Sequence, residues 1–200
     1  MEGLSLFHED EGWINWTGDR LPVKGKISTL YWGRDERLWV GTEEGVYSLL
    51  DEQWEVLTPP SSCGMVQSTF DITEDHLGSI WVSNVAGLHR WNGSRWSGVI
   101  PENGYSDFGG YPKFLLSSSS RDLIMTAPSP GLFRMLGAEY YDDEATAVVG
   151  TLAVVGAPIN RVVTALIEDS HSRLWAGTTG GVECYDGHSI VSLNWRDGLP

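Results

Sequence analysis

The sequence predicts an all-β fold, and three observations support this. Short runs rich in β-branched and aromatic residues are separated by turns that contain Asn, Asp or Gly, which tolerate a positive φ. One unit recurs along the 200 residues, with anchor positions spaced by 42, 43 and 51 residues at Trp39, Trp81, Ile124 and Trp175. In two copies the anchor strand is apolar on nearly every residue, so both of its faces must be covered. Repeats of about 40 to 50 residues made of short strands predict a β-propeller of four-stranded antiparallel blades.

The first 22 residues are predicted to form half a blade. Residues 3–7 and 13–16 correspond to the last two strands of the unit, and residues 19–22 (Asp-Arg-Leu-Pro) to its closing turn. Because only the last two strands are present, we expect the missing partners to lie beyond residue 200. The chain is therefore interpreted as about four blades plus a half blade of an incomplete ring, whose open edges should recruit another copy or aggregate.

Four blades are expected to follow the half blade, at approximately residues 23–60, 61–104, 105–158 and 159–200. The last copy is the clearest, with predicted strands at 163–168, 174–177, 182–185 and 190–195. The third copy departs from the pattern, because Pro128 and Pro130 stand where its hairpin should be. Residues 145–157 are expected to form its last strand and an extended connection, which accounts for the long step to Trp175.

The anchor Trp residues are expected to pack between neighbouring blades. A large aromatic at a fixed position of a repeat is typical of packing, so we assign no chemistry to Trp39, Trp81 or Trp175.

The repeats resemble the two-component regulator propeller repeats found in the sensor regions of hybrid two-component proteins. The resemblance rests on Glu168-Asp169, residues 174–178 (Leu-Trp-Ala-Gly-Thr), Gly181-Val182, Tyr185-Asp186 and residues 197–200 (Asp-Gly-Leu-Pro). It recurs in part around Trp81 and Trp39. It implies a bacterial, periplasmic or extracytoplasmic sensor segment that detects a small-molecule or carbohydrate cue and signals through dimer rearrangement to a kinase outside this chain.

Composition limits the classes of partner. The net charge of −14 argues against nucleic acid and against an anionic membrane surface. The most apolar stretch, residues 145–157, is shorter than the roughly 20 residues that span a bilayer, so direct membrane insertion is not expected. No signal peptide is visible after Met1.

Catalytic, metal and cofactor motifs are not found in the sequence. Cys63 and Cys184 lie in different repeats outside any metal-binding pattern, and Cys184 is expected in the core. The histidines show no metal-ligand spacing. The recurring pairs Glu74-Asp75 and Glu168-Asp169 are interpreted as structural residues of a turn rather than as acid/base groups or a calcium site. We therefore expect a non-enzymatic segment without cofactor.

Candidate binding residues are expected in the loops that follow the second and fourth strands of each blade, where propellers usually bind ligands. Arginine and tyrosine there offer contact area and directional hydrogen bonds. The candidates are Arg20, Glu43, Glu44, Asn84, Tyr105, Asp107, Arg161 and Thr179.

Three functions remain open on the sequence alone. The first is a ligand-binding sensor segment, whose partners would be other propeller segments of the same longer chain or a homodimer. The second is a stand-alone propeller that scaffolds protein contacts. The third is a lyase-like or glycan-acting propeller enzyme, which predicts clustered His and acidic residues around the central channel.

Overall fold

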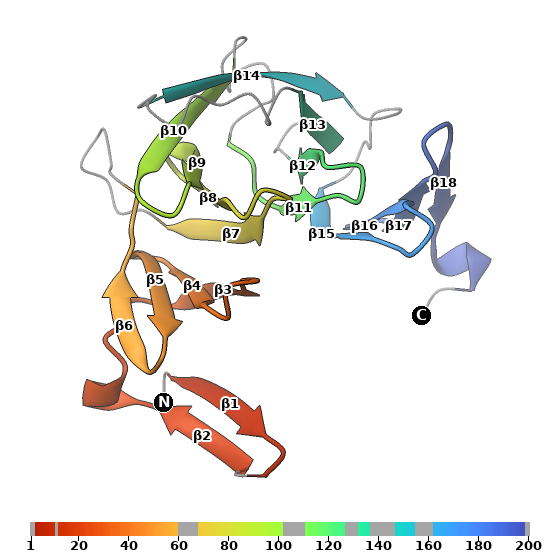
Figure 1. Ribbon diagram of the computed structural model, residues 1–200. Coiled ribbons are helices and arrows are strands. Elements are labelled where there is room, and N and C mark those ends of the chain that lie inside the picture. Colours follow the sequence, from red (N-terminus) through yellow and green to blue (C-terminus); the bar gives the residue numbers. More distant parts are fainter. Residues whose placement is uncertain are drawn as a thin grey trace.

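The computed structural model describes residues 3–10, 12–59, 68–101, 111–126, 132–136, 147–154 and 162–198. In these ranges the chain forms small sheets arranged as an open arc, with β1 and β2 near one end and β15 to β18 at the other (Figure 1). The predicted all-β propeller fold with an unclosed ring is confirmed.

Two outer sheets and one half blade are regular antiparallel meanders. The half blade consists of β1 (Leu4–His8) and β2 (Gly12–Trp16). Blade 1 consists of β3 (Ile27–Trp32), β4 (Leu38–Thr42), β5 (Gly45–Leu50) and β6 (Gln53–Val56). Blade 4 consists of β15 (Val163–Glu168), β16 (Leu174–Thr178), β17 (Gly181–Tyr185) and β18 (Ile190–Leu193). Short 3-10 turns, η1 (Gly18–Arg20) and η3 (Trp195–Asp197), follow the half blade and blade 4.

The two middle blades share one eight-stranded sheet. Blade 2 consists of β7 (Thr69–Glu74), β8 (Ile80–Asn84), β9 (Gly87–Trp91) and β10 (Trp96–Pro101). Blade 3 consists of β11 (Leu115–Ser117), β12 (Leu123–Thr126), β13 (Leu132–Leu136) and β14 (Ala147–Val154). The hairpin with Pro128 and Pro130 lies outside the described residues.

Strand β14 differs from the predicted antiparallel arrangement. As expected, it pairs antiparallel with β13, but only through residues 151–154. Residues 147–150 pair instead with β10 of blade 2, in parallel. One long strand can do this because its two halves lie along the outer edges of two blades (Figure 1). The four-stranded antiparallel blades are thus joined here by an additional parallel pairing that the sequence did not predict.

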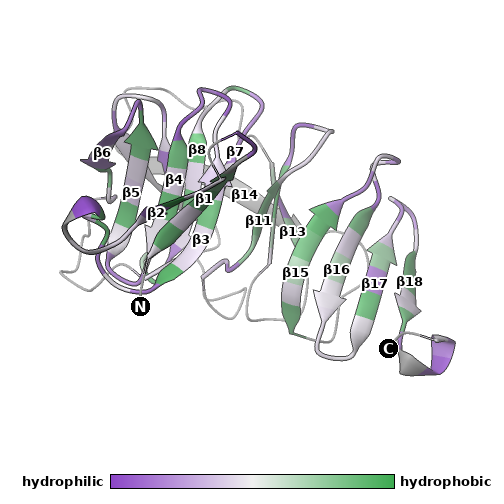
Figure 2. Cartoon of the chain, turned by 90° about the horizontal axis from the view of Figure 1, so that it is seen from below, coloured by the Kyte–Doolittle hydropathy of each residue, from purple (hydrophilic) through white to green (hydrophobic). Residues whose placement is uncertain are grey.

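The first strand of each blade lies toward the inside of the arc. Contacts link β3 to β7, β7 to β11 and β11 to β15, which places these strands side by side. The register shifts between the first and third residues of β3, β7 and β15, so each carries an irregularity at the same position. Hydrophilic residues gather in the turns at the strand ends, and hydrophobic bands run across most strands, whereas β6 is largely hydrophilic (Figure 2).

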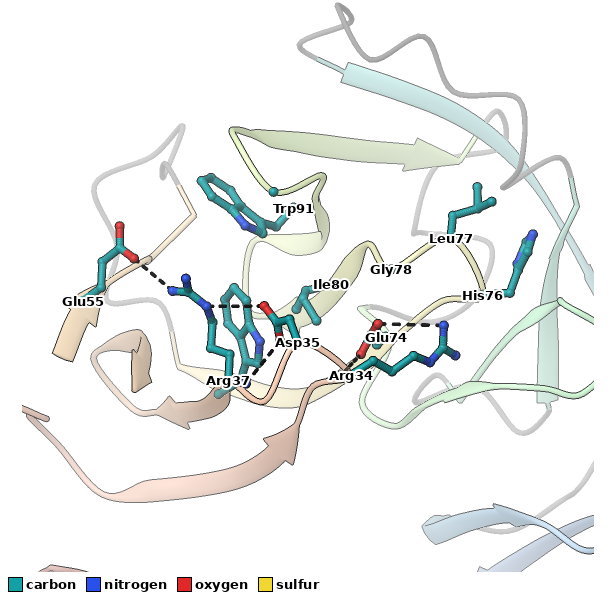
Figure 3. Close-up of a pocket in the computed structure, with 12 residues that line it drawn as sticks. Arg34, Asp35, Arg37, Glu55, Glu74, His76, Leu77, Gly78, Ile80 and Trp91 are labelled. Atoms are coloured by element: carbon teal, nitrogen blue, oxygen red, sulfur yellow. Dashed lines mark hydrogen bonds and ion pairs between the residues drawn. The ribbon is translucent and has the colours of Figure 1, made fainter. Parts of the chain in front are cut away.

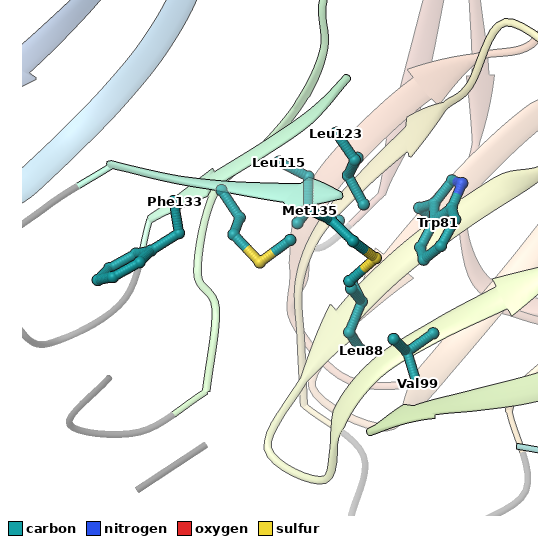
Figure 4. Packing of buried hydrophobic residues seen from close by; sticks show 8 residues of the cluster. Trp81, Leu88, Val99, Leu115, Leu123, Phe133 and Met135 are labelled. Atoms are coloured by element: carbon teal, nitrogen blue, oxygen red, sulfur yellow. The ribbon is translucent and has the colours of Figure 1, made fainter. Parts of the chain in front are cut away.

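Neighbouring blades pack through a repeated apolar pattern. Each of blades 1 to 3 offers its anchor residue and an apolar residue at the start of its third strand to the first two strands of the next blade. Figure 4 shows this at the joint of blades 2 and 3, where Trp81 and Leu88 meet Leu115 and Leu123. The corresponding clusters contain Trp39, Val46, Ile72, Ile80 and Val82 between blades 1 and 2, and Ile124, Leu132, Leu174 and Ala176 between blades 3 and 4. Trp39 and Trp81 are 1% and 0% exposed, as the sequence predicted.

Candidate functional site

An aspartate organises the turn between the first two strands of blade 2. Asp75 Oδ1 accepts hydrogen bonds from the backbone N–H groups of Leu77 and Ser79, both at 2.9 Å. Its Oδ2 accepts the indole N–H of Trp81 at 2.7 Å. The carboxylate therefore holds the turn and also satisfies the polar atom of the buried anchor residue.

Asp169 plays the same part in blade 4, with one more donor. It accepts the backbone N–H groups of His171 and Arg173 at 2.9 and 3.1 Å and the indole N–H of Trp175 at 2.8 Å. The Arg173 guanidinium adds a charged donor, with Nε 2.7 Å from Oδ2. Hydrogen bonds from Trp175 and then Arg173 hold the pKa of this carboxyl well below its usual range. The predicted structural role of the aspartates in this turn is confirmed.

The glutamates beside these aspartates act between blades. Glu74 Oε2 accepts the backbone N–H of Arg34, in the equivalent turn of blade 1, at 2.8 Å. Glu168 accepts the backbone N–H and the hydroxyl of Ser119, in the turn of blade 3, at 2.6 and 2.7 Å. Arg34 and Ser119 occupy the same repeat position. The sequence pattern missed this bridge because it shows only the turn in which each glutamate lies.

Blade 1 lacks the aspartate of this turn. Gly33 stands six residues before the anchor Trp39, where Asp75 and Asp169 stand before theirs. Among the described residues, no acceptor hydrogen-bonds the buried Nε1 of Trp39. Asp35 replaces part of the missing interaction, since its Oδ1 accepts the backbone N–H of Arg37 at 3.2 Å. The anchor residue of blade 1 is thus left with an unsatisfied donor.

A polar pocket of about 680 Å³ lies at this turn, between blades 1 and 2 (Figure 3). Arg34 lies toward one side with Glu74, and Arg37 lies toward the other with Asp35 and Glu55. The pocket lining also contains Trp39, His76, Leu77, Gly78, Ile80, Trp91 and Gly93. The pocket therefore combines aromatic rings with charged donors and acceptors, as small polar ligands require.

The corresponding notch between blades 3 and 4 is smaller and differs in charge. It has a volume of about 280 Å³ and includes Ser118, Asp122, Arg134 and Glu168. Asp122 occupies the repeat position of Arg37, and its ion pair with Arg134 measures 3.4 Å. Equivalent backbone geometry thus presents different chemistry at the two notches.

Asp71 is a half-buried carboxyl on the inner strand β7. It accepts the hydroxyl of Thr29 at 3.2 Å and the backbone N–H groups of Ile72 and Leu115 at 2.9 and 2.8 Å. Burial raises its pKa above the usual range, and these hydrogen bonds oppose the shift. Since Thr29 and Leu115 belong to blades 1 and 3, Asp71 ties three blades together near the axis.

The predicted loop candidates lie at the other ends of the strands. Glu43, Glu44 and Thr179 are exposed in turns between second and third strands. Asn84 is the last residue of β8, just before the equivalent turn of blade 2. It is 0% exposed, and its Oδ1 accepts the backbone N–H of Ala86 at 2.8 Å. The Asn84 side chain therefore stabilises the turn that follows it. The structure does not bring these four residues into one pocket.

Arg20 lies in η1 and lines a third, mainly apolar cleft of about 630 Å³ between the half blade and blade 1. Its neighbours there include Trp16, Leu30 and Trp32. The remaining candidates, Tyr105, Asp107 and Arg161, lie outside the described residues, as does Cys63.

The described residues contain no group of three or more His, Cys, Asp or Glu side chains that could hold a metal ion. Cys184 is buried with a free thiol, as expected for a core residue. No helix within the described ranges is long and apolar enough to cross a membrane.

Residues 156–180 match the family model for the two component regulator propeller. This segment is therefore similar to a regulator propeller repeat. The resemblance noted in the sequence is confirmed for this segment. No curated protein matches the chain in sequence.

Solved structures similar to this chain share its fold at low identity. A catalytically inactive virginiamycin B lyase from Staphylococcus aureus, solved with quinupristin, is 17% identical with a TM-score of 0.73, over 99% of this chain and 64% of that one. The extracellular domain of a hybrid two component system from B. thetaiotaomicron is 17% identical with a TM-score of 0.66, over 100% of this chain and 30% of that one. PorZ, a surface component of the type-IX secretion system of Porphyromonas gingivalis, is 12% identical with a TM-score of 0.73, over 98% and 32%.

This chain thus spans less than two thirds of each of these structures. At these identities the likeness establishes the fold alone.

Proposed function

We propose that the chain is a non-catalytic, ligand-binding segment of a sensory propeller in a two-component signalling protein, acting outside the cytoplasm. The observation that carries this proposal is the match of residues 156–180 to the two component regulator propeller. The likeness in fold to extracellular domains of two component systems supports it.

Binding, rather than catalysis, suits the chemistry of the described residues. The polar side chains at the notches between blades are largely held in hydrogen bonds and ion pairs. Such an arrangement can recognise a small-molecule or carbohydrate cue by hydrogen bonding and aromatic contact. Further propeller segments of the same protein, or a second copy of it, would be the partners that transmit the signal.

The first test is to sequence the coding DNA across both ends of this reading frame. We expect further repeats, followed by a membrane-spanning segment and a kinase module. In-frame deletion of the 200 codons should then abolish cue-dependent transcription in the source cells. A frame that starts at Met1 and stops after Pro200 would contradict the signalling role and favour a scaffold that associates with other chains.

An enzyme is the second candidate, because the likeness to virginiamycin B lyase covers nearly the whole chain. Incubation of the chain with quinupristin, followed by mass spectrometry, tests it. Because ring opening by elimination leaves the mass unchanged, the readout is chromatographic retention and the fragment spectrum. We expect both to persist, and a ring-opened isomer would overturn the non-catalytic proposal.

A further inference from the structure

Blade 4 shows how the repeat binds a carboxylate. Four donors converge on Asp169: the Trp175 indole N–H, the Arg173 guanidinium and the backbone N–H groups of Arg173 and His171, at 2.8, 2.7, 3.1 and 2.9 Å. The guanidinium also lies 5.4 Å from the centre of the Trp175 ring. The low pKa of Asp169 shows that these donors favour the ionised carboxylate.

Blade 1 retains the same donors without the aspartate. Arg37 and Trp39 stand at the positions of Arg173 and Trp175, and the Arg37 guanidinium lies 5.8 Å from the centre of the Trp39 ring. Trp39 is 1% exposed, and none of the described residues accepts its indole N–H. Gly33 occupies the aspartate position, and an added Cβ there would lie 3.4 Å from Trp39 Nε1. A carboxylate reaching this point from the pocket would meet the donors that hold Asp169.

Asp35 replaces the missing aspartate of blade 1 only in part. Its Oδ2 lies 3.6 Å from Arg37 Nε, much longer than the 2.7 Å contact in blade 4, and its side chain is 60% exposed. Its Oδ1 would lie 2.6 Å from a Cβ on Gly33, so it occupies the approach to Trp39. Because this side chain is exposed and loosely paired, it can turn into water when a stronger acceptor arrives.

We propose that the pocket between blades 1 and 2 binds a small organic carboxylate, whose carboxyl group takes the place of the aspartate that blade 1 lacks. Arg37 and Trp39 bind the carboxylate. Trp91 and Arg34 line the rest of the pocket and contact the body of the ligand. The volume of about 680 Å³ accommodates a ligand well beyond acetate in size, such as an acidic sugar.

Local acidity opposes this binding but does not prevent it. The pocket lining contains Asp35, Glu55 and Glu74 beside Arg34 and Arg37. Glu74 is already engaged by the backbone N–H of Arg34. Glu55 and the Ser48 hydroxyl hold Nη1 of Arg37 at 3.0 and 2.8 Å. This leaves Nε and Nη2 for the ligand, and these are the atoms by which Arg173 holds Asp169. Binding should accordingly be selective for ligands that add contacts to the carboxylate.

The test measures the indole N–H signal of Trp39 by two-dimensional NMR on the 200-residue chain, assigned with Trp39→Phe. The probes are sodium acetate and sodium glucuronate, with glucose and sodium chloride as matched controls. We expect both carboxylates to move the Trp39 signal in a saturable manner, glucuronate at lower concentration, and the controls to leave it in place. An unmoved signal, or an equal response to sodium chloride, would overturn the proposal.

Two substitutions exchange the properties of blades 1 and 4. Gly33→Asp should move the Trp39 signal without ligand and abolish its response to acetate, because the chain then supplies its own carboxylate. Asp169→Gly should create an acetate response at Trp175. If Gly33→Asp fails to fold, Asp169→Gly still decides whether this donor set captures a free carboxylate, and its lack of response would count against the proposal.

The role of this site in detecting a cue rests on the proposed sensory function, but the binding test does not. If the chain binds carboxylates but the reading frame encodes no kinase, the binding site is supported and the signalling role is contradicted. A complete signalling protein whose Trp39 signal ignores carboxylates would remove only the site.

Discussion

Equivalent positions of the repeat have different surroundings inside the arc, where two blades meet, and at its ends, where no complete blade follows. Ile72 in β7 and Leu30 in β3 are equivalent, yet Ile72 is 3% exposed and Leu30 is 51% exposed. Ile72 packs with Trp39 and Val46 of the preceding blade. Leu30 instead lines the cleft beside the half blade, which supplies Leu4 but no anchor residue. Burial at these positions therefore depends on the neighbouring blade rather than on the residue, and stability should follow the same division.

The largest difference is expected at the anchor residues. Trp81→Ala should lower the free energy of unfolding by about 4 kcal/mol, because it opens a cavity at a fully buried position. Trp175→Ala, at the half-buried anchor of the end blade, should cost less than about half as much. Urea denaturation followed by circular dichroism measures both. Equal losses would show that the end face is covered in solution, for example by a second copy.

Substitution of aliphatic residues tests the same difference between the interior of the arc and its ends. Ile72→Ala should lower the free energy of unfolding by about 3 kcal/mol, and Leu30→Ala by less than about 1 kcal/mol. Thermal unfolding at several protein concentrations measures both effects. If Leu30→Ala proves as costly as Ile72→Ala only at high concentration, self-association through this face is the cause.

Lowering the pH should reduce the stability of the protein through a buried histidine of blade 2. Burial lowers the pKa of His89 to about 4, whereas the unfolded side chain titrates near 6.5. Between these values the unfolded state binds more protons, so stability falls as the pH is lowered. The loss should reach roughly 2 kcal/mol between pH 6.5 and pH 4.5. His89→Gln should remove this part of the pH dependence, while His188→Gln, an exposed control, should retain it.

The smallest effect is expected at the glutamate bridges. Glu74→Gln removes the charge from a 5% exposed acceptor of the Arg34 backbone N–H and should cost about 1 kcal/mol. Glu168→Gln, at a more exposed side chain, should cost less because water solvates the weakened contact. Chemical denaturation of the two variants at equal ionic strength compares them. A larger loss at Glu168 would contradict the division between interior and end.

The features that the repeats share could be predicted from the sequence. The anchor tryptophans were predicted to pack between blades, and glycine was expected in the turns between strands. Gly45 and Gly181 have φ values of +145° and +132°, and a Cβ on Gly181 would collide with the backbone of Leu193, so this position requires glycine.

Contacts between blades could not be predicted from the repeat pattern. Glu74 and Glu168 were assigned to their own turns, but their partners lie 40 and 49 residues earlier in the chain. The polar pocket was also missed, although Gly33 at an aspartate position was a visible signal. Its meaning depends on Trp39 lacking an acceptor, which only the packed structure reveals.

Strand β14 makes the joint between blades 2 and 3 different in kind from the others. Because its backbone is hydrogen-bonded to β10 and to β13, neither blade can swing or unfold without breaking the ladder of the other. Amide hydrogen exchange should therefore report one opening event for both blades, separate from those of blades 1 and 4. Any bending of the arc would then be confined to the joints on either side, one of which holds the pocket at Trp39.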